Sequence, residues 1–226
     1  MGNRVTGQAL YRCGICGDKP CALNGWHCYV RSNLDTLPSA KPTLLKEDTL
    51  RIYITGASCA GVTTLGQHLA LLLDLQHVDV DDYYWLPTNP PFTTKRLPDE
   101  RVSLMQRQLG DDDWVLSGSC INWGDALIAH ADLIVFVVTP TPVRLERLAA
   151  REKQRFGDRI APGGDMHEIH VAFREWASQY DNPGFSGRNR AWHEAWLSAQ
   201  TAPVLRVDGI SSSEQMAADV IHALAQ

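Results

Sequence analysis

The sequence predicts an α/β fold in three layers, in which helices cover both faces of a five-stranded parallel sheet. Strand-like and helix-like segments alternate from about residue 50 to the end of the chain, which is the pattern of βαβ units. Residues 132–139 (DLIVFVVT) are apolar on both faces, as a central parallel strand should be. A glycine-rich segment follows the first strand, at the sheet edge where such folds bind ligands.

The strands and helices are expected in a regular order. Short runs rich in β-branched or aromatic residues predict the strands 50–55, 77–81, 114–117, 132–139 and 204–207. Helical spacing of apolar residues predicts the helices 63–73, 98–109, 141–154, 167–180, 190–199 and 213–224. Asp99 and Glu100 suit the first turn of the second helix, and Ser211 or Ser212 can cap the last one.

Composition excludes several classes of protein. With 226 residues, 44% of them apolar, the chain can bury one sizeable core. A formal net charge of -5 gives no electrostatic reason to bind nucleic acid or an anionic membrane. No apolar run approaches the roughly 20 residues of a membrane span, and residues 1–10 do not resemble a secretory signal. We expect a cytoplasmic protein, either monomer or homodimer, without nucleic-acid or membrane partners.

Residues 1–48 differ in composition from the rest. They contain scattered Gly, Pro and Asn and four cysteines, Cys13, Cys16, Cys21 and Cys28. This arrangement resembles a zinc knuckle only loosely, because a second C-x-x-C is absent. We expect an irregular, disordered extension and linker before a domain at 49–226; zinc binding and a misassigned start codon stay open. In the reducing cytoplasm the six cysteines would not form a disulfide framework.

The segment GASCAGVTT follows the P-loop pattern G-x-x-x-x-G-K-[ST] at every defined position except one. Its glycines let successive N–H groups point inward, and the helix that follows adds the positive end of its dipole. Val62 stands where the lysine belongs, so bound phosphates need another cation. The alternative is a turn that binds nothing. The expected nucleotide-binding residues are Gly56, Ala57, Ser58, Cys59, Ala60, Gly61, Val62, Thr63 and Thr64.

This loop, the acidic segment HVDVDD and an arginine-rich helix carry a resemblance that covers residues 50–226. The chain resembles the adenylate-kinase-like and shikimate-kinase-like P-loop kinases, and bacterial AAA-family or adenylate-kinase-like proteins whose loop reads GASGSGTTTLG. The resemblance implies ATP and Mg²⁺ as cofactors. It implies that Thr63 and, through water, Asp79 hold Mg²⁺, and that Asp81 orients or deprotonates an acceptor hydroxyl. Fold transfers more firmly than substrate.

Arginines recur every three or four residues from 144 to 159, which places Arg144, Arg147, Arg151, Arg155 and Arg159 on one helix face. A solvated face is the alternative. The run leads into a Gly/Pro-rich stretch that suits a mobile lid, and the resemblance implies that lid arginines close over a triphosphate. We expect Arg147 in the nucleotide site. Our hypothesis is that Arg151 and Arg155 supply the lost cation and act in catalysis.

Two further segments bear on function. Ser117 ends the third strand where related kinases often have Asp, and is expected near the site; Lys95 and Arg96 are candidates for contact with a substrate anion. The favoured function is transfer of the γ-phosphoryl group of ATP to a nucleoside, nucleotide or small hydroxylated metabolite. The alternative is a regulatory nucleotide-binding module, since Val62 and Ser117 each remove a charge. An NTPase acting on macromolecules lacks recognisable motifs.

Overall fold

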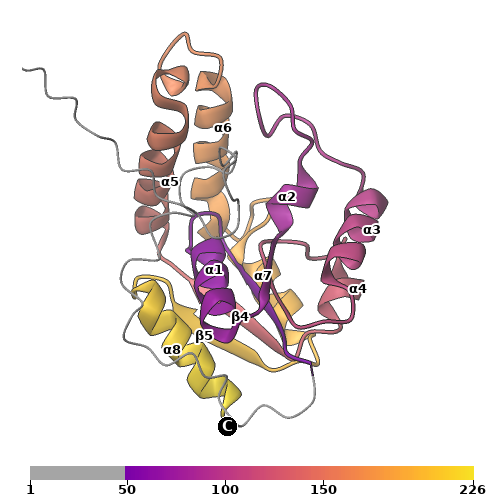
Figure 1. The fold of residues 1–226 in the computed structure, drawn as a ribbon. Coiled ribbons are helices and arrows are strands. Elements are labelled where there is room, and N and C mark those ends of the chain that lie inside the picture. The colour runs from indigo at the N-terminus through magenta and orange to yellow at the C-terminus, as the bar shows by residue number, and fades with distance from the viewer. Residues whose placement is uncertain (1–48) are drawn as a thin grey trace, which may run out of the picture. The chain divides into compact units, whose positions relative to one another are not determined.

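A computed structural model describes residues 49–226. The cysteine-containing segment 1–48, with the expectations made for it, lies outside the described residues. The sheet has five parallel strands in the order β2-β3-β1-β4-β5 (Figure 1). The strands are β1 (Arg51–Gly56), β2 (Gln76–Asp79), β3 (Trp114–Ser117), β4 (Leu133–Val138) and β5 (Val204–Asp208). The predicted five-stranded parallel sheet is therefore confirmed.

Helices cover both faces of this sheet, as predicted. On one face lie α1 (Val62–Leu73) and α8 (Ser213–Leu224); on the other lie α3 (Pro98–Leu109), α4 (Asp125–Ile128) and α7 (Arg190–Ser198) (Figure 1). Alternation along β1 divides its side chains between the two cores, because successive strand residues point to opposite faces. Ile52 and Ile54 pack with α1 and α8, whereas Tyr53 packs with the other helices.

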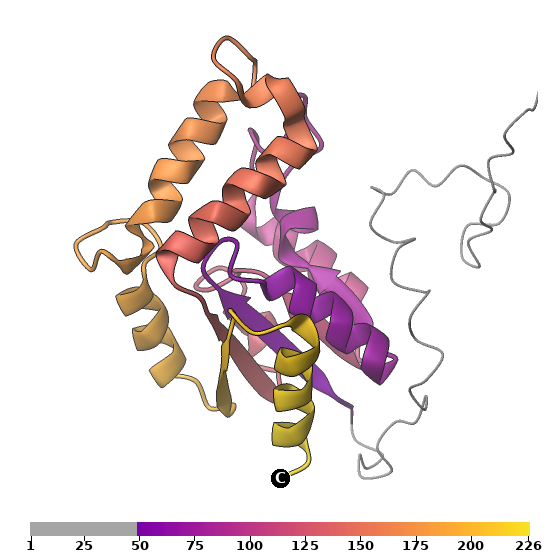
Figure 2. The same cartoon turned by 90° about the vertical axis from the view of Figure 1, so that its left-hand side faces the viewer.

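The predicted helical lid is an antiparallel hairpin beyond the sheet (Figure 2). It consists of α5 (Thr141–Phe156), a 3-10 turn (Gly157–Ile160) and α6 (His167–Ser178), and a second 3-10 turn (Gln179–Asp181) follows. Arg144 anchors the base of α5: it is 1% exposed, and its guanidinium donates hydrogen bonds to the Thr139 carbonyl and the Thr141 hydroxyl. Glu152 and His170 join the two helices farther along, with Oε2 and Nδ1 2.8 Å apart.

One predicted strand ends early, at the start of a short helix, and another short helix was not predicted at all. The strand expected at 77–81 ends at Asp79, and a short helix, α2 (Val80–Tyr84), begins at once. The Asp79 carboxylate accepts a hydrogen bond from the Asp81 backbone N–H at 2.9 Å, so it caps this helix. Asp79 and Asp81 therefore do not share a strand face. The four-residue helix α4 was also missed, because it is too short to show helical periodicity.

Within residues 49–226, no helix is both long and apolar enough to span a bilayer.

Candidate functional site

The glycine-rich loop joins β1 to α1 and leaves the helix N-terminus open. Gly61 is the N-cap residue of α1, with φ of +107°, and no side chain caps the helix. The first intrahelical bond of this turn runs from the Leu65 N–H to the Gly61 carbonyl at 2.9 Å. The amides before Leu65 therefore have no acceptor within the helix. Such a terminus, carrying the positive dipole end, fits a phosphate group.

Contacts from β4, β5 and α5 hold the outer side of the loop. The Ala60 carbonyl accepts hydrogen bonds from Thr139 Oγ1 at 2.9 Å and from Arg147 Nη1 at 3.3 Å. A Cβ at Gly209 would collide with the Thr139 side chain, and one at Gly56 would lie 2.7 Å from the Val137 carbonyl. The loop thus presses closely on its neighbours, and Arg147 touches it directly.

Thr63 and Asp79, predicted to share a magnesium ion, lie side by side. A hydrogen bond from Thr63 and another from the Asp81 amide lower the pKa of Asp79, but desolvation outweighs both and raises it above its usual value. Among residues 49–226, no cluster of three His, Cys, Asp or Glu side chains could hold a metal ion. This donor set still fits Mg²⁺, which usually keeps several waters and takes one or two carboxylates together with phosphate oxygens.

The charges of three arginines influence the pKa of the Asp81 carboxyl. Desolvation raises this pKa, and the nearby Asp79 charge raises it further. The charges of Arg188, Arg151 and Arg155 act in the opposite direction. None of the three arginines forms an ion pair with a carboxylate in the described part of the chain. Arg151 and Arg155 thus lie close enough to Asp81 to influence its pKa, without an ion pair among the described residues to neutralise them.

Arg159, from the same predicted arginine row, lies apart from this group. Its guanidinium pairs with Asp165, with Nη2 2.6 Å from Oδ2, and also donates to the Asn89 side-chain oxygen at 3.3 Å. The row is therefore divided by function: its first member is structural, and its last is paired at the tip of the hairpin.

Arg188 is a site residue that sequence analysis missed. Its Nη2 donates at 3.0 Å to the hydroxyl of Ser58 in the glycine-rich loop, residues 56–64, which we call the phosphate loop. Its guanidinium carbon lies 5.3 Å from the centre of the Trp176 ring. It belongs to the irregular segment NPGFSGRN (residues 182–189) before α7. A lone arginine in such a segment carries no periodic or motif signal, so nothing short of the fold reveals its position.

A second missed arginine lies against aromatic side chains of α2 and of the segment that follows β3. Arg101 of α3 is 6% exposed, and its guanidinium carbon lies 3.9 Å from the Tyr84 ring centre and 5.0 Å from that of Trp123. Arg96, a sequence candidate for anion binding, is instead engaged by Glu100 at 2.7 Å. Lys95, the other candidate, lies 5.8 Å from the Tyr84 ring centre. Lys95 and Arg101 thus both lie over the ring of Tyr84, in the same short helix as Asp81.

Ser117 is the register partner of Asp79 and so lies next to the candidate site, but its side chain points into the core. Its side chain is fully buried, and its hydroxyl lies 2.9 Å from His77 Nε2. A Cβ at Gly66 of α1 would lie 2.9 Å from the Cβ of Ser117, so α1 packs directly over the serine. The residue therefore joins β2, β3 and α1 instead of facing a ligand.

Comparison with known proteins establishes a relationship. No protein-family model matches the chain. A protein of Bacillus subtilis (strain 168), described as uncharacterized protein YqaC, is 44% identical over 158 residues, which cover 70% of this chain and 87% of that protein. The chain belongs to the YqaC family.

Solved structures with the same general arrangement include three kinases. They are a sugar kinase from Janibacter sp. HTCC2649 (13% identity, TM-score 0.43, 78% of this chain and 94% of that one), a shikimate kinase from Acinetobacter baumannii (16%, 0.43, 78% and 93%) and a gluconokinase from Sinorhizobium meliloti 1021 (16%, 0.45, 78% and 91%). All three TM-scores lie below 0.5, so neither activity nor substrate follows for the YqaC family from these likenesses.

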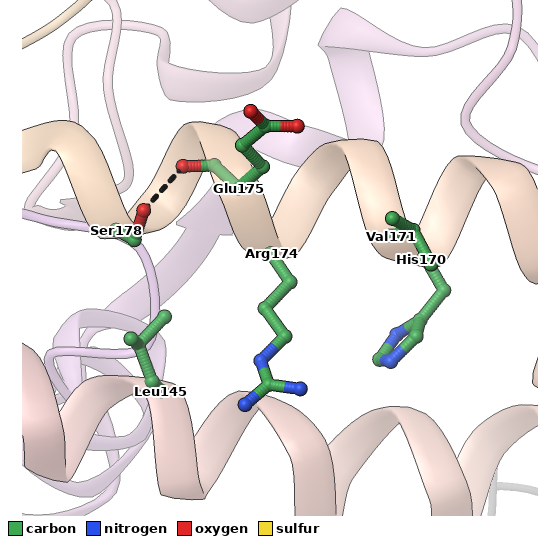
Figure 3. A pocket seen from close by; sticks show the side chains of 6 residues that line it. All are labelled: Leu145, His170, Val171, Arg174, Glu175 and Ser178. Carbon is green, nitrogen blue, oxygen red and sulfur yellow. Dashed lines mark hydrogen bonds between the residues drawn. The ribbon is translucent and has the colours of Figure 1, made fainter.

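This member of the YqaC family also has a pocket of about 380 Å³ on the hairpin (Figure 3). Leu145 of α5 lines it from one side, and α6 supplies the remaining lining residues, His170, Val171, Arg174, Glu175 and Ser178. None of the residues that surround Asp81 or the phosphate loop lines it. The pocket therefore belongs to the packing between α5 and α6 and not to the candidate site.

Proposed function

We propose that the chain transfers the γ-phosphoryl group of ATP to a small-molecule acceptor. One observation carries the proposal: the charges of three arginines, which have no ion-pair partner among residues 49–226, act on the Asp81 carboxylate, and one of them, Arg188, hydrogen-bonds to the loop before an uncapped helix N-terminus. Phosphoryl transfer needs this combination, because its catalysis consists mainly of positioning and of stabilising charge on the transferred group.

ATP would bind with its phosphates against the amides of residues 56–64. Arg147 would contribute from α5 by holding the loop in place through the Ala60 carbonyl. Thr63 and, through water, Asp79 would hold Mg²⁺, which neutralises phosphate charge when bound. Arg151 and Arg155 would stabilise the charge of the group in transfer. Desolvation and the Arg151 charge both lower the pKa of Arg155, and a bound anion would relieve that repulsion.

The acceptor would lie between Asp81 and the aromatic residues Tyr84 and Trp123. Asp81 would orient its hydroxyl or accept the proton, and the raised pKa of this carboxyl makes it a better base than an exposed aspartate. Arg101 lacks an ion-pair partner among residues 49–226. Among nucleosides, nucleotides and hydroxylated metabolites, this arginine favours an acceptor that carries an anionic group.

A second candidate is a regulatory nucleotide-binding module with little or no turnover. It is favoured by Val62, which packs on the core, and by Ser117, which is buried against His77. Neither position can supply the charge that catalysis normally uses. Binding and turnover therefore have to be measured separately.

The test uses the purified full-length chain with ATP, Mg²⁺ and a panel of hydroxylated acceptors, half of them anionic. We expect acceptor-dependent ADP release that falls roughly 10²- to 10⁴-fold in Asp81→Asn, the usual contribution of a general base. ATP affinity should change little in that variant. Asp82→Asn, on the same short helix, is the matched control and should keep the activity. ATP binding without acceptor-dependent release would favour the regulatory module, and no ATP binding would exclude both.

A further inference from the structure

The phosphate loop lacks a cation of its own, and the structure shows where the side chain at position 62 goes instead. Val62 packs against the core formed with α1 and α8. Its Cγ2 would lie only 3.0 Å from a Cβ built on Gly56, so it covers the start of the loop backbone. A cation that balances the charge of a bound phosphate therefore has to come from another element.

Two arginines near the loop already donate hydrogen bonds to backbone carbonyls. Arg144 donates to the carbonyls of Thr139 and Ser58, and its guanidinium lies 4.9 Å from the Tyr180 ring centre. Arg147 donates to the Ala60 carbonyl, which Thr139 already holds toward β4. Both arginines therefore support the loop from outside, through its carbonyl groups. A phosphate ligand would need a cation on the side of the amides and hydroxyls.

Arg188 meets that requirement. It approaches the loop through the Ser58 hydroxyl and not through a carbonyl. Its Nε is buried and has no hydrogen-bond partner among residues 49–226. Desolvation lowers its pKa, while the charges of Tyr180 and Asp81 oppose the shift. A desolvated guanidinium with an unsatisfied donor is unfavourable until an anion accepts from it.

The segment that carries Arg188 is built to hold it in place. Asn189 Nδ2 donates to the Phe185 carbonyl at 2.8 Å and to the Gly187 carbonyl at 3.3 Å, which closes the turn. A Cβ at Gly187 would lie 3.0 Å from Trp176 Nε1, so only glycine lets the turn pack this closely on α6. The guanidinium is therefore oriented before any ligand arrives, which reduces the entropy lost on binding.

We propose that Arg188 supplies the phosphate-binding cation that lysine supplies in loops with the full pattern. The inference rests on the proposed nucleotide binding but not on turnover. The ligand is the phosphate chain of a nucleoside triphosphate. Arginine suits the role, because its planar fork can donate to two phosphate oxygens at once. Arg151 and Arg155 keep the separate role of stabilising the group in transfer.

Calorimetric titration of the full-length chain with ATP·Mg²⁺, and with adenosine as a phosphate-free probe, tests this directly. Arg188→Ala should weaken ATP binding roughly 10- to 100-fold, the range for a charge-assisted hydrogen-bonded pair, and leave adenosine binding unchanged. The ATP affinity of Arg188→Lys should lie between that of the unmodified chain and that of Arg188→Ala. Adding Val62→Lys to Arg188→Ala should restore ATP affinity to within about 3-fold of the unmodified chain, because the new ammonium replaces the lost charge.

Arg107→Ala, an exposed arginine in the last turn of α3, is the matched control and should bind as the unmodified chain does. Val62→Lys alone shows whether lysine is tolerated at this position. Equal ATP affinity with and without Arg188, or no recovery from a lysine that is tolerated at position 62, would overturn the inference alone. Absence of ATP binding in the unmodified chain would overturn the proposed function together with it.

Discussion

Cys59 illustrates what a single residue of the loop contributes. It has a φ of +62°, a left-handed conformation that costs a residue with a side chain roughly 1–2 kcal/mol relative to glycine. Burial also raises the pKa of its thiol, which keeps the sulfur protonated. The position is one where related loops often have glycine, and the backbone angle supplies the physical reason. The loop therefore keeps its shape despite a residue that disfavours it.

The environment of His193 in α7 makes the free energy of unfolding depend on pH. Its ring is fully buried, its Nδ1 lies 2.6 Å from the Tyr180 hydroxyl, and burial, with a smaller effect of Arg188, lowers its pKa to about 3. Between pH 6.5 and pH 3 the unfolded chain binds a proton here that the folded chain does not. This residue therefore contributes no pH dependence well above pH 6.5 and destabilises the fold progressively as the pH falls through that window.

We expect the free energy of unfolding to fall by about 2 kcal/mol between pH 7 and pH 5 from His193 alone. Urea unfolding of the unmodified chain and of His193→Phe at both pH values measures this part. The variant should lose correspondingly less stability on acidification. An equal loss in both proteins would show that folding does not lower the pKa of His193.

Helix α5 shows how an element distributes a row of like residues. Helical spacing places its arginines on one face, but the helix advances about 1.5 Å per residue. Each arginine therefore meets a different partner. Arg144 ties the base to the domain, Arg147 supports the loop, and the charges of Arg151 and Arg155 lower the pKa of Asp81. Arg159 lies in the 3-10 turn that follows α5 and pairs with Asp165 at the tip.

Removing the two central arginines of α5 separates catalysis from binding. In Arg151→Ala/Arg155→Ala, kcat for acceptor-dependent ADP release should fall roughly 100-fold or more, the scale of lost electrostatic stabilisation in the transition state. The KM for ATP should change only a few-fold, since the loop and Arg188 remain. Arg174→Ala, on the neighbouring helix α6, is the control and should keep kcat within about 2-fold. Unchanged turnover in the double variant would remove both arginines from the mechanism.

At the scale of the molecule, two cores hold the strands that carry the candidate site. One core joins β1, β3 and β4 to α1 and α8; the other joins the opposite face of the sheet to α3, α4 and α7. The phosphate loop follows β1, the central strand, and Asp79 ends β2 at the sheet edge. The site is thus assembled by strands that the two cores hold rigidly.

Residues 49–226 are therefore expected to fold and bind nucleotide as a unit. ATP·Mg²⁺ at about 100 times its dissociation constant should raise the free energy of unfolding by about 2.7 kcal/mol, both in this fragment and in the full chain. Denaturant titration with and without nucleotide measures the shift. A fragment that folds but gains no stability from nucleotide would show that binding needs residues before 49.

The sequence by itself determined the five strands, most of the helices and the phosphate loop, because each has a local signature in periodicity, composition or glycine spacing. The helix 98–109 and the strand 114–117 were predicted to the residue. Only the tertiary structure decided the strand order, the helix that starts at Val80, the burial of Ser117 and the positions of Arg101 and Arg188. Those depend on contacts between residues far apart in the chain, and a lone arginine in a turn carries no local sign of the partner that folding will bring to it.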